Sequence, residues 1–160
     1  MQVREVLYKD VIKVRPSTSL AELLDLFKEF HTFPMVPVID DENRLIGEVS
    51  FKSFLEVFQP FGSDTKRLLE TVSFVDQEEA SSIFEAEIPP EMGVLLIVED
   101  LMDRRVITVR EDSSLEKAYS LMKMHNLEHL PVLNAENQFV GMLGVFDVVL
   151  AIFRERGILK

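Results

Sequence analysis

The chain contains one short pattern twice, and this duplication limits what it can fold into. Residues 11–15 read VIKVR and return as residues 106–110, which read VITVR. Further along, Pro37-Val38 returns as Pro131-Val132, and the offset between the copies has changed by only one residue. An offset kept this constant predicts two copies of one supersecondary unit. Any binding site must therefore be judged against its counterpart in the other copy.

Composition narrows the functional classes. The chain has 160 residues, of which 47% are hydrophobic, and a net charge of −11. This acidity makes nucleic acid and anionic membrane poor partners. The absence of cysteine excludes disulfides, thiol catalysis and cysteine-based metal sites. Residues 1–10 lack a signal-peptide pattern, and the apolar runs are too short or too interrupted to span a bilayer. We expect a cytoplasmic protein.

Each copy has the pattern of a β-α-β-β-α unit. The pattern predicts extended runs at 11–14 and 106–109, helices beginning at 20 and 115, hairpins at 37–49 and 131–143, and closing helices at 51–58 and 145–155. A helical opening is expected over 95–102. The predicted boundaries are 1–58 for the first unit and 94–160 for the second.

Residues 59–93 form an acidic excursion between the copies, with helices expected at 64–72 and 76–87. Residues 76–91 carry several carboxylates and no Lys or Arg. Such a run is typical of a solvated helix face, and a docking surface for a basic partner is the alternative.

Paired motifs carry a resemblance to a known family. Residues 127–133 read LEHLPVL and residues 139–147 read FVGMLGVFD, and the first copy matches them through Val36–Ile39 and Leu45–Ser50. The chain resembles the CBS-domain pair, or Bateman module. The resemblance implies an α/β (α+β) fold with a pseudo-two-fold axis relating the units. It also implies an adenosine ligand, such as AMP, ADP, ATP or S-adenosylmethionine, in clefts between them, and a flat homodimer.

The family motif G-h-x-[ST]-x-x-D locates the expected ribose contact. An ionised Asp can accept hydrogen bonds from both hydroxyls of a ribose diol. The second copy has this acid, Asp147, but Gly144 replaces the hydroxyl residue. The first copy has the hydroxyl residue, Ser50, but Ser53 replaces the acid. The second copy is therefore predicted to be the better site.

The resemblance assigns further contacts around Asp147. The predicted ligand-binding residues are Asp147, Ile107, Thr108, Ser113, Leu127, Glu128, His129, Pro131 and Gly144, with a weaker second site at Ser50, Thr18 and Ile12. Ile107 and Leu127 would wall the adenine slot with Leu130, and backbone groups near Thr108 and Glu128 would bind the ring edge. Phosphate would meet His129 and the helix start at Ser113, where open N–H groups favour anions.

Alternatives remain open at three of these positions. Asp147 is also a favourable helix-start residue without any ligand. Gly144 represents either a lost phosphate contact or room for close backbone approach. His129 could be an ordinary surface or core histidine, and it is mostly uncharged at neutral pH unless an anion raises its pKa.

Other functional classes are disfavoured. The three histidines lack the spaced carboxylates of a metal site, and no nucleophile triad, phosphate-binding loop or dinucleotide fingerprint is present. The sequence predicts a non-catalytic module that signals a conformational change to an unidentified effector protein. A ligand-free dimerisation or scaffold module is the alternative. Aromatic residues on both closing helices, Phe146 and Phe153 among them, suggest contact with another subunit.

Overall fold

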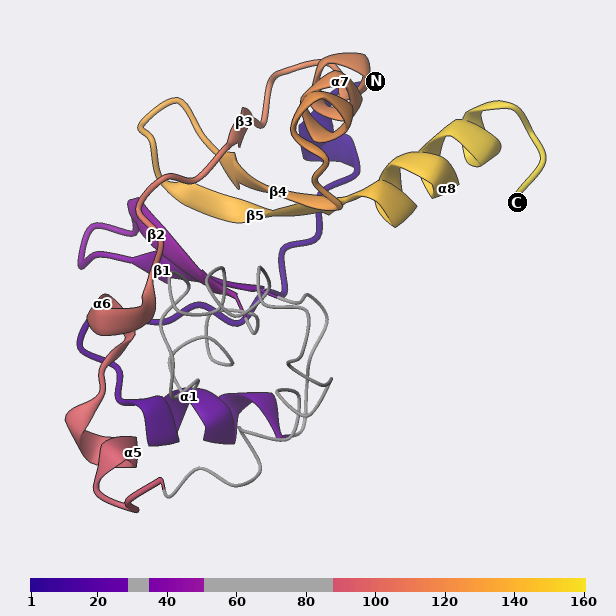
Figure 1. Ribbon diagram of the computed structural model, residues 1–160. Coiled ribbons are helices and arrows are strands. Elements are labelled where there is room, and N and C mark those ends of the chain that lie inside the picture. Colours follow the sequence, from indigo (N-terminus) through magenta and orange to yellow (C-terminus); the bar gives the residue numbers. More distant parts are fainter. Residues whose placement is uncertain (29–34, 51–87) are drawn as a thin grey trace, which may run out of the picture.

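The computed structural model describes residues 1–28, 35–50 and 88–160, and it places two small sheets one above the other (Figure 1). The helices expected at 51–58, 64–72 and 76–87, together with His31 and Ser53, lie outside the described residues. Among residues 1–28, 35–50 and 88–160, which the structure describes, no helix is both long and apolar enough to cross a bilayer.

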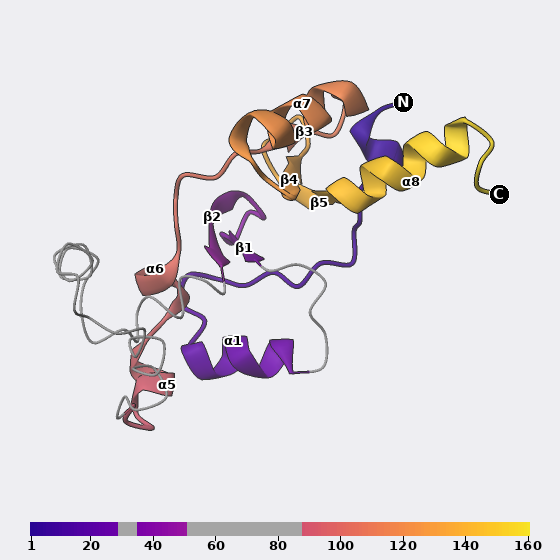
Figure 2. The ribbon, with the colours of Figure 1, turned by 45° about the vertical axis from the view of Figure 1, so that its right-hand side comes forward.

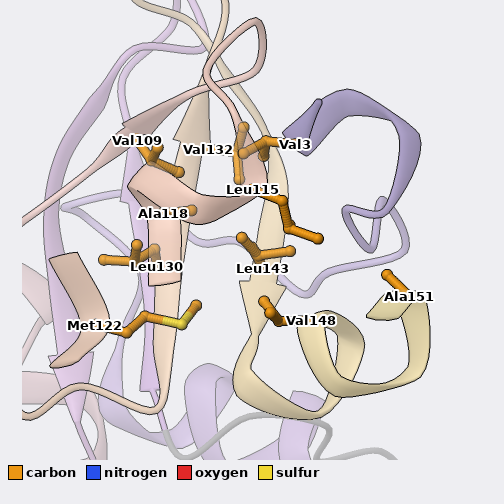
Figure 3. Close-up of a cluster of buried hydrophobic side chains, with 10 residues drawn as sticks. All are labelled: Val3, Val109, Leu115, Ala118, Met122, Leu130, Val132, Leu143, Val148 and Ala151. Atoms are coloured by element: carbon orange, nitrogen blue, oxygen red, sulfur yellow. The ribbon is translucent and has the colours of Figure 1, made fainter. Parts of the chain in front are cut away.

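The C-terminal copy is a complete β-α-β-β-α unit, as predicted. Its elements are β3 (Val109–Arg110), α7 (Leu115–His125), β4 (His129–Leu133), β5 (Phe139–Gly144) and α8 (Val145–Glu155). β4 and β5 form an antiparallel hairpin, and β3 lies parallel to β4. Leu130, Leu143 and Val148 are buried between this sheet and its helices (Figure 3).

The N-terminal copy repeats this arrangement with α1 (Leu20–Phe27), β1 (Met35–Ile39) and β2 (Leu45–Ser50). β1 and β2 form an antiparallel hairpin, and Val14 makes one parallel bridge to Val38 where the other copy has β3. Leu23, Val36 and Val49 lie in its own core.

The two copies exchange their leading segments, residues 1–8 and 96–103. The first contains the 3-10 helix η1 (Val3–Glu5) and the second contains α6 (Val98–Leu101), which follows the short helix α5 (Met92–Leu95). The N–H of Val3 donates to the carbonyl of Ser113 at 3.0 Å, and the N–H of Val98 donates to the carbonyl of Thr18 at 2.8 Å. Val3 is buried beside Val132 and Leu115 in the core of the C-terminal copy (Figure 3). Each leading segment thus completes the core of the other copy.

The exchange explains where two sequence predictions are wrong. The strands expected over 11–14 and 106–109 shrink to the Val14 bridge and to β3. Asp103 is paired with Glu48 in the N-terminal copy, yet Val109 is paired with Val132 in the other copy. The chain must cross between the copies within these few residues, so it cannot run beside β4 for longer. The single helix expected over 95–102 is broken at Leu96, whose carbonyl accepts the N–H of Leu20.

A third apolar cluster joins the two copies. It contains Met35 and Ile39 of β1 and Phe139 and Met142 of β5. At the hairpin turns, Arg44 forms an antiparallel bridge with Gln138, its own counterpart in the repeat. A bridge between equivalent residues marks the position of the pseudo-two-fold axis. Figure 2 shows the β1–β2 hairpin lying below the β4–β5 hairpin.

Candidate functional site

The strand directions gather most of the predicted contacts at one end of the C-terminal sheet. Because β3 and β4 are parallel and β5 is antiparallel, the segments that lead into β3 and β4 come from the end of the sheet where β5 finishes, and β3 itself begins beside Val132. Ile107 and Thr108 directly precede β3, and Leu127 and Glu128 directly precede β4. Gly144 is the last residue of β5. These residues therefore lie near one end of the C-terminal sheet, and none of them lies at its opposite end.

Asp147 lies in the first turn of α8 and caps that helix. The N–H of Gly144 donates to Asp147 Oδ2 at 2.9 Å. This bond satisfies one of the amides that a helix leaves open at its start. Asp147 therefore stabilises the start of α8 even without a ligand. An ionised carboxylate has about four acceptor positions, and this cap occupies one of them. The remaining positions could accept both hydroxyls of a ribose.

His129 lies directly beside this cap. It opens β4 and is the antiparallel partner of Gly144. Burial lowers the pKa of His129, and the nearby Glu128 carboxylate only partly offsets that effect. The imidazole is therefore neutral near pH 7, and an anion bound here would have to raise its pKa to gain a charge.

Alternation along the strands decides which side chains face the other copy. Leu130 and Val132 are buried in the C-terminal core. His129 and Pro131 alternate with them and lie on the opposite face, where Met142 is the partner of Pro131. Met142 belongs to the cluster that joins the copies. His129 and Pro131 consequently face the interface between the copies.

The apolar candidates belong to the core at the same time. Ile107 and Leu127 are partly buried and pack against the C-terminal core, in which Leu130 is fully buried. Asn126 adopts a left-handed conformation with φ of 53° and turns the chain from α7 toward β4. The N–H of Leu127 then donates to the carbonyl of Met122 at 2.8 Å. These contacts fix Leu127 at the end of the sheet.

Ser113 is not gathered with the other candidates. It follows the opposite end of β3, and its N–H donates to the carbonyl of Arg110 at 3.0 Å. The helix cap is Ser114, whose Oγ accepts the N–H of Lys117 at 3.2 Å. The N–H of Ser113 itself is not open, because it closes the turn between β3 and α7.

The N-terminal copy has the same layout with different side chains. Ser50 ends β2 as the partner of Met35, and Ile12 packs against the N-terminal core. Thr18 lies past the other end, where its Oγ1 accepts the N–H of Arg15 at 3.1 Å. Ile12 and Ser50 thus correspond in position to Ile107 and Gly144, and Thr18 corresponds to Ser113.

Sequence reasoning assigned no place at this face to Met142 or to its counterpart Glu48. The signal was the alternation of each return strand. Met142 stands two residues before Gly144, and Glu48 stands two residues before Ser50, so each pair shares one face. Over residues 1–28, 35–50 and 88–160, no three His, Asp or Glu side chains form a group suited to a metal ion.

Comparison with known proteins shows matches over most of the chain. The family model of the CBS domain matches residues 3–59 and residues 98–154. The CBS domain-containing protein CBSX2, chloroplastic, of Arabidopsis thaliana is 31% identical over 144 residues, which cover 86% of this chain and 57% of the relative. Inosine-5'-monophosphate dehydrogenase of Methanocaldococcus jannaschii is 24% identical over 145 residues, and these span 91% of this chain but only 22% of the relative.

Solved structures match along the whole chain. The crystal structure of CBSX2 in complex with AMP gives a TM-score of 0.68 at 25% identity, with 97% of this chain and 98% of that chain covered. A hypothetical conserved protein from Geobacillus kaustophilus gives a TM-score of 0.70 at 22% identity, with 97% and 98% covered.

Proposed function

The chain belongs to the CBS domain family, with one copy of the domain in each half, and we propose that it is a non-catalytic regulatory module for an adenosine ligand. The ligand would bind between the copies, against the end of the C-terminal sheet. A change in the angle between the copies would then be passed to an effector protein. The ligand class includes AMP, ADP, ATP and S-adenosylmethionine.

One observation carries this proposal. Asp147 and His129 meet at Gly144, through the cap of α8 and the pairing of β4 with β5. A carboxylate that can accept from a ribose diol is thus bonded to the backbone of Gly144, and an imidazole that can donate to phosphate belongs to the strand partner of Gly144. Gly144 carries no side chain of its own between them. AMP is the first ligand to test, because the relative CBSX2 has been solved with AMP.

The apolar cluster between the copies supports a conformational output. Met35, Ile39, Phe139 and Met142 join the copies directly. The N–H of Phe139 also donates to the carbonyl of Asn43 at 2.8 Å. A ligand shifts the angle at such a junction only by its difference in affinity for the two arrangements, which is about 1–3 kcal/mol in typical couplings.

Calorimetric titration with AMP tests the site. We expect Asp147→Asn to weaken AMP binding at least tenfold, because an amide oxygen that accepts the N–H of Gly144 has one acceptor position left for two hydroxyls. The amide oxygen can still accept the N–H of Gly144, so the free energy of unfolding should stay near that of the wild type. Asp100→Asn is the matched control, since Asp100 caps α6 in the same way, with Oδ2 3.2 Å from the N of Ile97.

The outcomes separate the alternatives for Asp147. Equal AMP affinity in the wild type and in Asp147→Asn would leave Asp147 as a helix cap alone. AMP at about one hundred times its Kd should add about 2.7 kcal/mol to the free energy of unfolding. If AMP, ADP, ATP and S-adenosylmethionine all leave stability unchanged, the sensor proposal fails.

The phosphate role of His129 has a separate test. His129→Ala should weaken AMP binding more than adenosine binding, because only AMP presents an anion to the imidazole. Bound phosphate would raise the pKa of His129, so AMP binding by the wild type should take up a proton near pH 7. Calorimetry in two buffers of different ionisation enthalpy measures that uptake. Equal losses for AMP and adenosine would remove this role.

The outer face of α8 favours a second candidate, a dimerisation module. Phe146, Val149 and Phe153 lie on the side of the helix opposite the buried Val148 and Ala151. Phe146 is 71% exposed. α8 also lies at the outer edge of the C-terminal copy (Figure 1). A helix that is apolar on both sides is suited to burial against another chain, and we propose a second copy of this protein.

Light scattering after gel filtration tests this face. Phe146→Glu should convert dimers to monomers, whereas Val94→Glu, at a similarly exposed position (74%) on α5, should not. A monomeric wild type would overturn the dimer proposal. A dimer that binds none of the four adenosine ligands would favour the ligand-free scaffold.

A further inference from the structure

The face of the N-terminal copy toward the interface carries a carboxylate that its counterpart lacks. Val49 is buried in the N-terminal core, so Glu48 and Ser50 lie on the opposite face of β2. Glu48 pairs with Pro37, just as Met142 pairs with Pro131 in the other copy. The half-buried Glu48 therefore occupies the position of an apolar Met142, beside the hydroxyl predicted to contact a ligand.

A second carboxylate comes from the exchanged leading segment. Glu48 and Asp103 form an antiparallel bridge with reciprocal backbone bonds of 2.9 and 2.8 Å. Residues paired in this way project their side chains to the same face of the ladder. The corresponding pair in the other copy is Met142 and Tyr8, neither of which is charged at neutral pH.

Within residues 1–28, 35–50 and 88–160, the ion pair made by one of these two carboxylates is a long one. Arg105 Nε lies 3.9 Å from Asp103 Oδ1, and the side chain of Arg105 is almost fully exposed. Burial raises the pKa of Glu48, and the charge of Asp103 raises it further. The direction of this effect indicates that Glu48 is partly shielded from water and feels the charge of Asp103.

From this geometry we infer that Glu48 excludes phosphate from the ligand face of the N-terminal copy, which then accepts only adenosine derivatives without a phosphate group. The inference rests on the proposed function. A phosphate monoester carries close to two negative charges at pH 7, and a carboxylate in a partly buried setting repels it with little screening. An uncharged nucleoside meets no such repulsion, and Glu48 can accept hydrogen bonds from its hydroxyls.

Calorimetric titration of the full chain tests the inference by stoichiometry. We expect AMP to bind the wild type once per chain, in a manner that depends on Asp147. Adenosine added to the AMP-saturated chain should bind one further equivalent. Glu48→Gln should create a second AMP site, with affinity at least tenfold above that of the wild type for the same position. Asp103→Asn should have a smaller effect in the same direction.

The control is Glu99→Gln, an exposed carboxylate of α6 that is paired with Arg104 at 3.3 Å and lies outside the β2 face. This variant should leave the AMP stoichiometry at one. Two equal AMP sites in the wild type, or a single AMP site retained in Glu48→Gln, would overturn the inference while leaving the proposed function intact. Absence of any adenosine ligand binding to the wild type would overturn both.

Discussion

The N-terminal and C-terminal copies share their backbone closely and differ in the side chains that they turn toward each other. Both hairpins turn through an asparagine with positive φ, 62° at Asn43 and 61° at Asn137. In both turns one side-chain oxygen, from Asp40 or from Asn134, accepts two backbone N–H groups. Even the irregularity in strand register recurs at the same place. The backbone is thus a duplicated scaffold.

Two differences lie on the face that the copies share. His129 stands where the other copy has Met35, and Met142 stands where it has Glu48. Main-chain hydrogen bonds tolerate any of these side chains, because each strand bonds through its backbone. The comparison teaches that the two copies kept one scaffold, while the faces that they turn toward each other differ in chemistry.

The largest expected difference is between the two glycines of the return strands. A Cβ at Gly141 would lie 2.4 Å from both Leu7 Cδ1 and the carbonyl oxygen of Tyr8, and the φ of Gly141 is +155°. A Cβ at Gly47 would lie 2.9 Å from the carbonyl oxygen of Asp103. Gly141→Ala should therefore cost about 3 kcal/mol or more, and Gly47→Ala about 1–2 kcal/mol.

Urea unfolding of the two variants measures this difference. Both glycines meet an exchanged leading segment, but only Gly141 adds an unfavourable φ for alanine. Equal losses of stability in Gly47→Ala and Gly141→Ala would show that the two junctions are equally tight.

The exchange itself predicts which copy each leading segment stabilises. Val3 and Val98 are both fully buried, in the cores of the C-terminal and N-terminal copies respectively. Each Val→Ala change should cost about 2 kcal/mol. Hydrogen exchange should then quicken in β4 and β5 for Val3→Ala, and in β1 and β2 for Val98→Ala. Faster hydrogen exchange in the opposite copy would contradict the exchanged positions of the two leading segments.

Much of this architecture could be predicted from the sequence. The helix at 145–155 was predicted with the bounds that α8 has, because its apolar period and the start signal at Asp147 agree. The hairpins followed from Pro-Val strand starts and from turns rich in Asp and Asn. Periodicity and turn chemistry are local properties, so a single sequence carries them.

The exchange of leading segments could not be predicted in this way. The apolar residues of 3–7 fit either core, and only the three-dimensional contacts choose between them. The exchange also shortens β3, because the chain must cross from the N-terminal copy to the C-terminal copy just before this strand. For the site, His129 and the cap formed by Asp147 both adjoin Gly144, whereas Ser113 lies beyond the other end of β3. Glu48 was not singled out from the sequence, because only the three-dimensional structure shows that it lies on the face of β2 toward the other copy.

A smaller difference is expected between the two turn asparagines. Asn43 Nδ2 donates to the carbonyl of Phe139 in the other copy at 2.9 Å, in a partly buried position. Asn137 Oδ1 accepts from Arg110 at 2.9 Å on the exposed surface of its own copy. Glycine allows the positive φ at both positions, so the backbone cost is shared.

Asn43→Gly should therefore lose about 1 kcal/mol more stability than Asn137→Gly, which is the worth of one partly buried hydrogen bond. Thermal unfolding of the two variants under identical conditions gives the comparison. A greater loss for Asn137→Gly would mean that the link between the copies at this turn contributes less than the exposed bond to Arg110.

The smallest expected difference concerns pH at His129, whose counterpart Met35 cannot titrate. Burial lowers the pKa of His129 below its unfolded value of about 6.5, so the fold favours the neutral imidazole. The resulting stability is present above pH 6.5 and is lost as pH falls through the lower pKa of the folded state. His129→Met makes the two copies alike at this position. Between pH 7.5 and 5 the wild type should lose stability relative to His129→Met in urea unfolding. A parallel decline of both proteins would show that protonation of His129 is not linked to folding, and that the two faces do not differ in their response to acid.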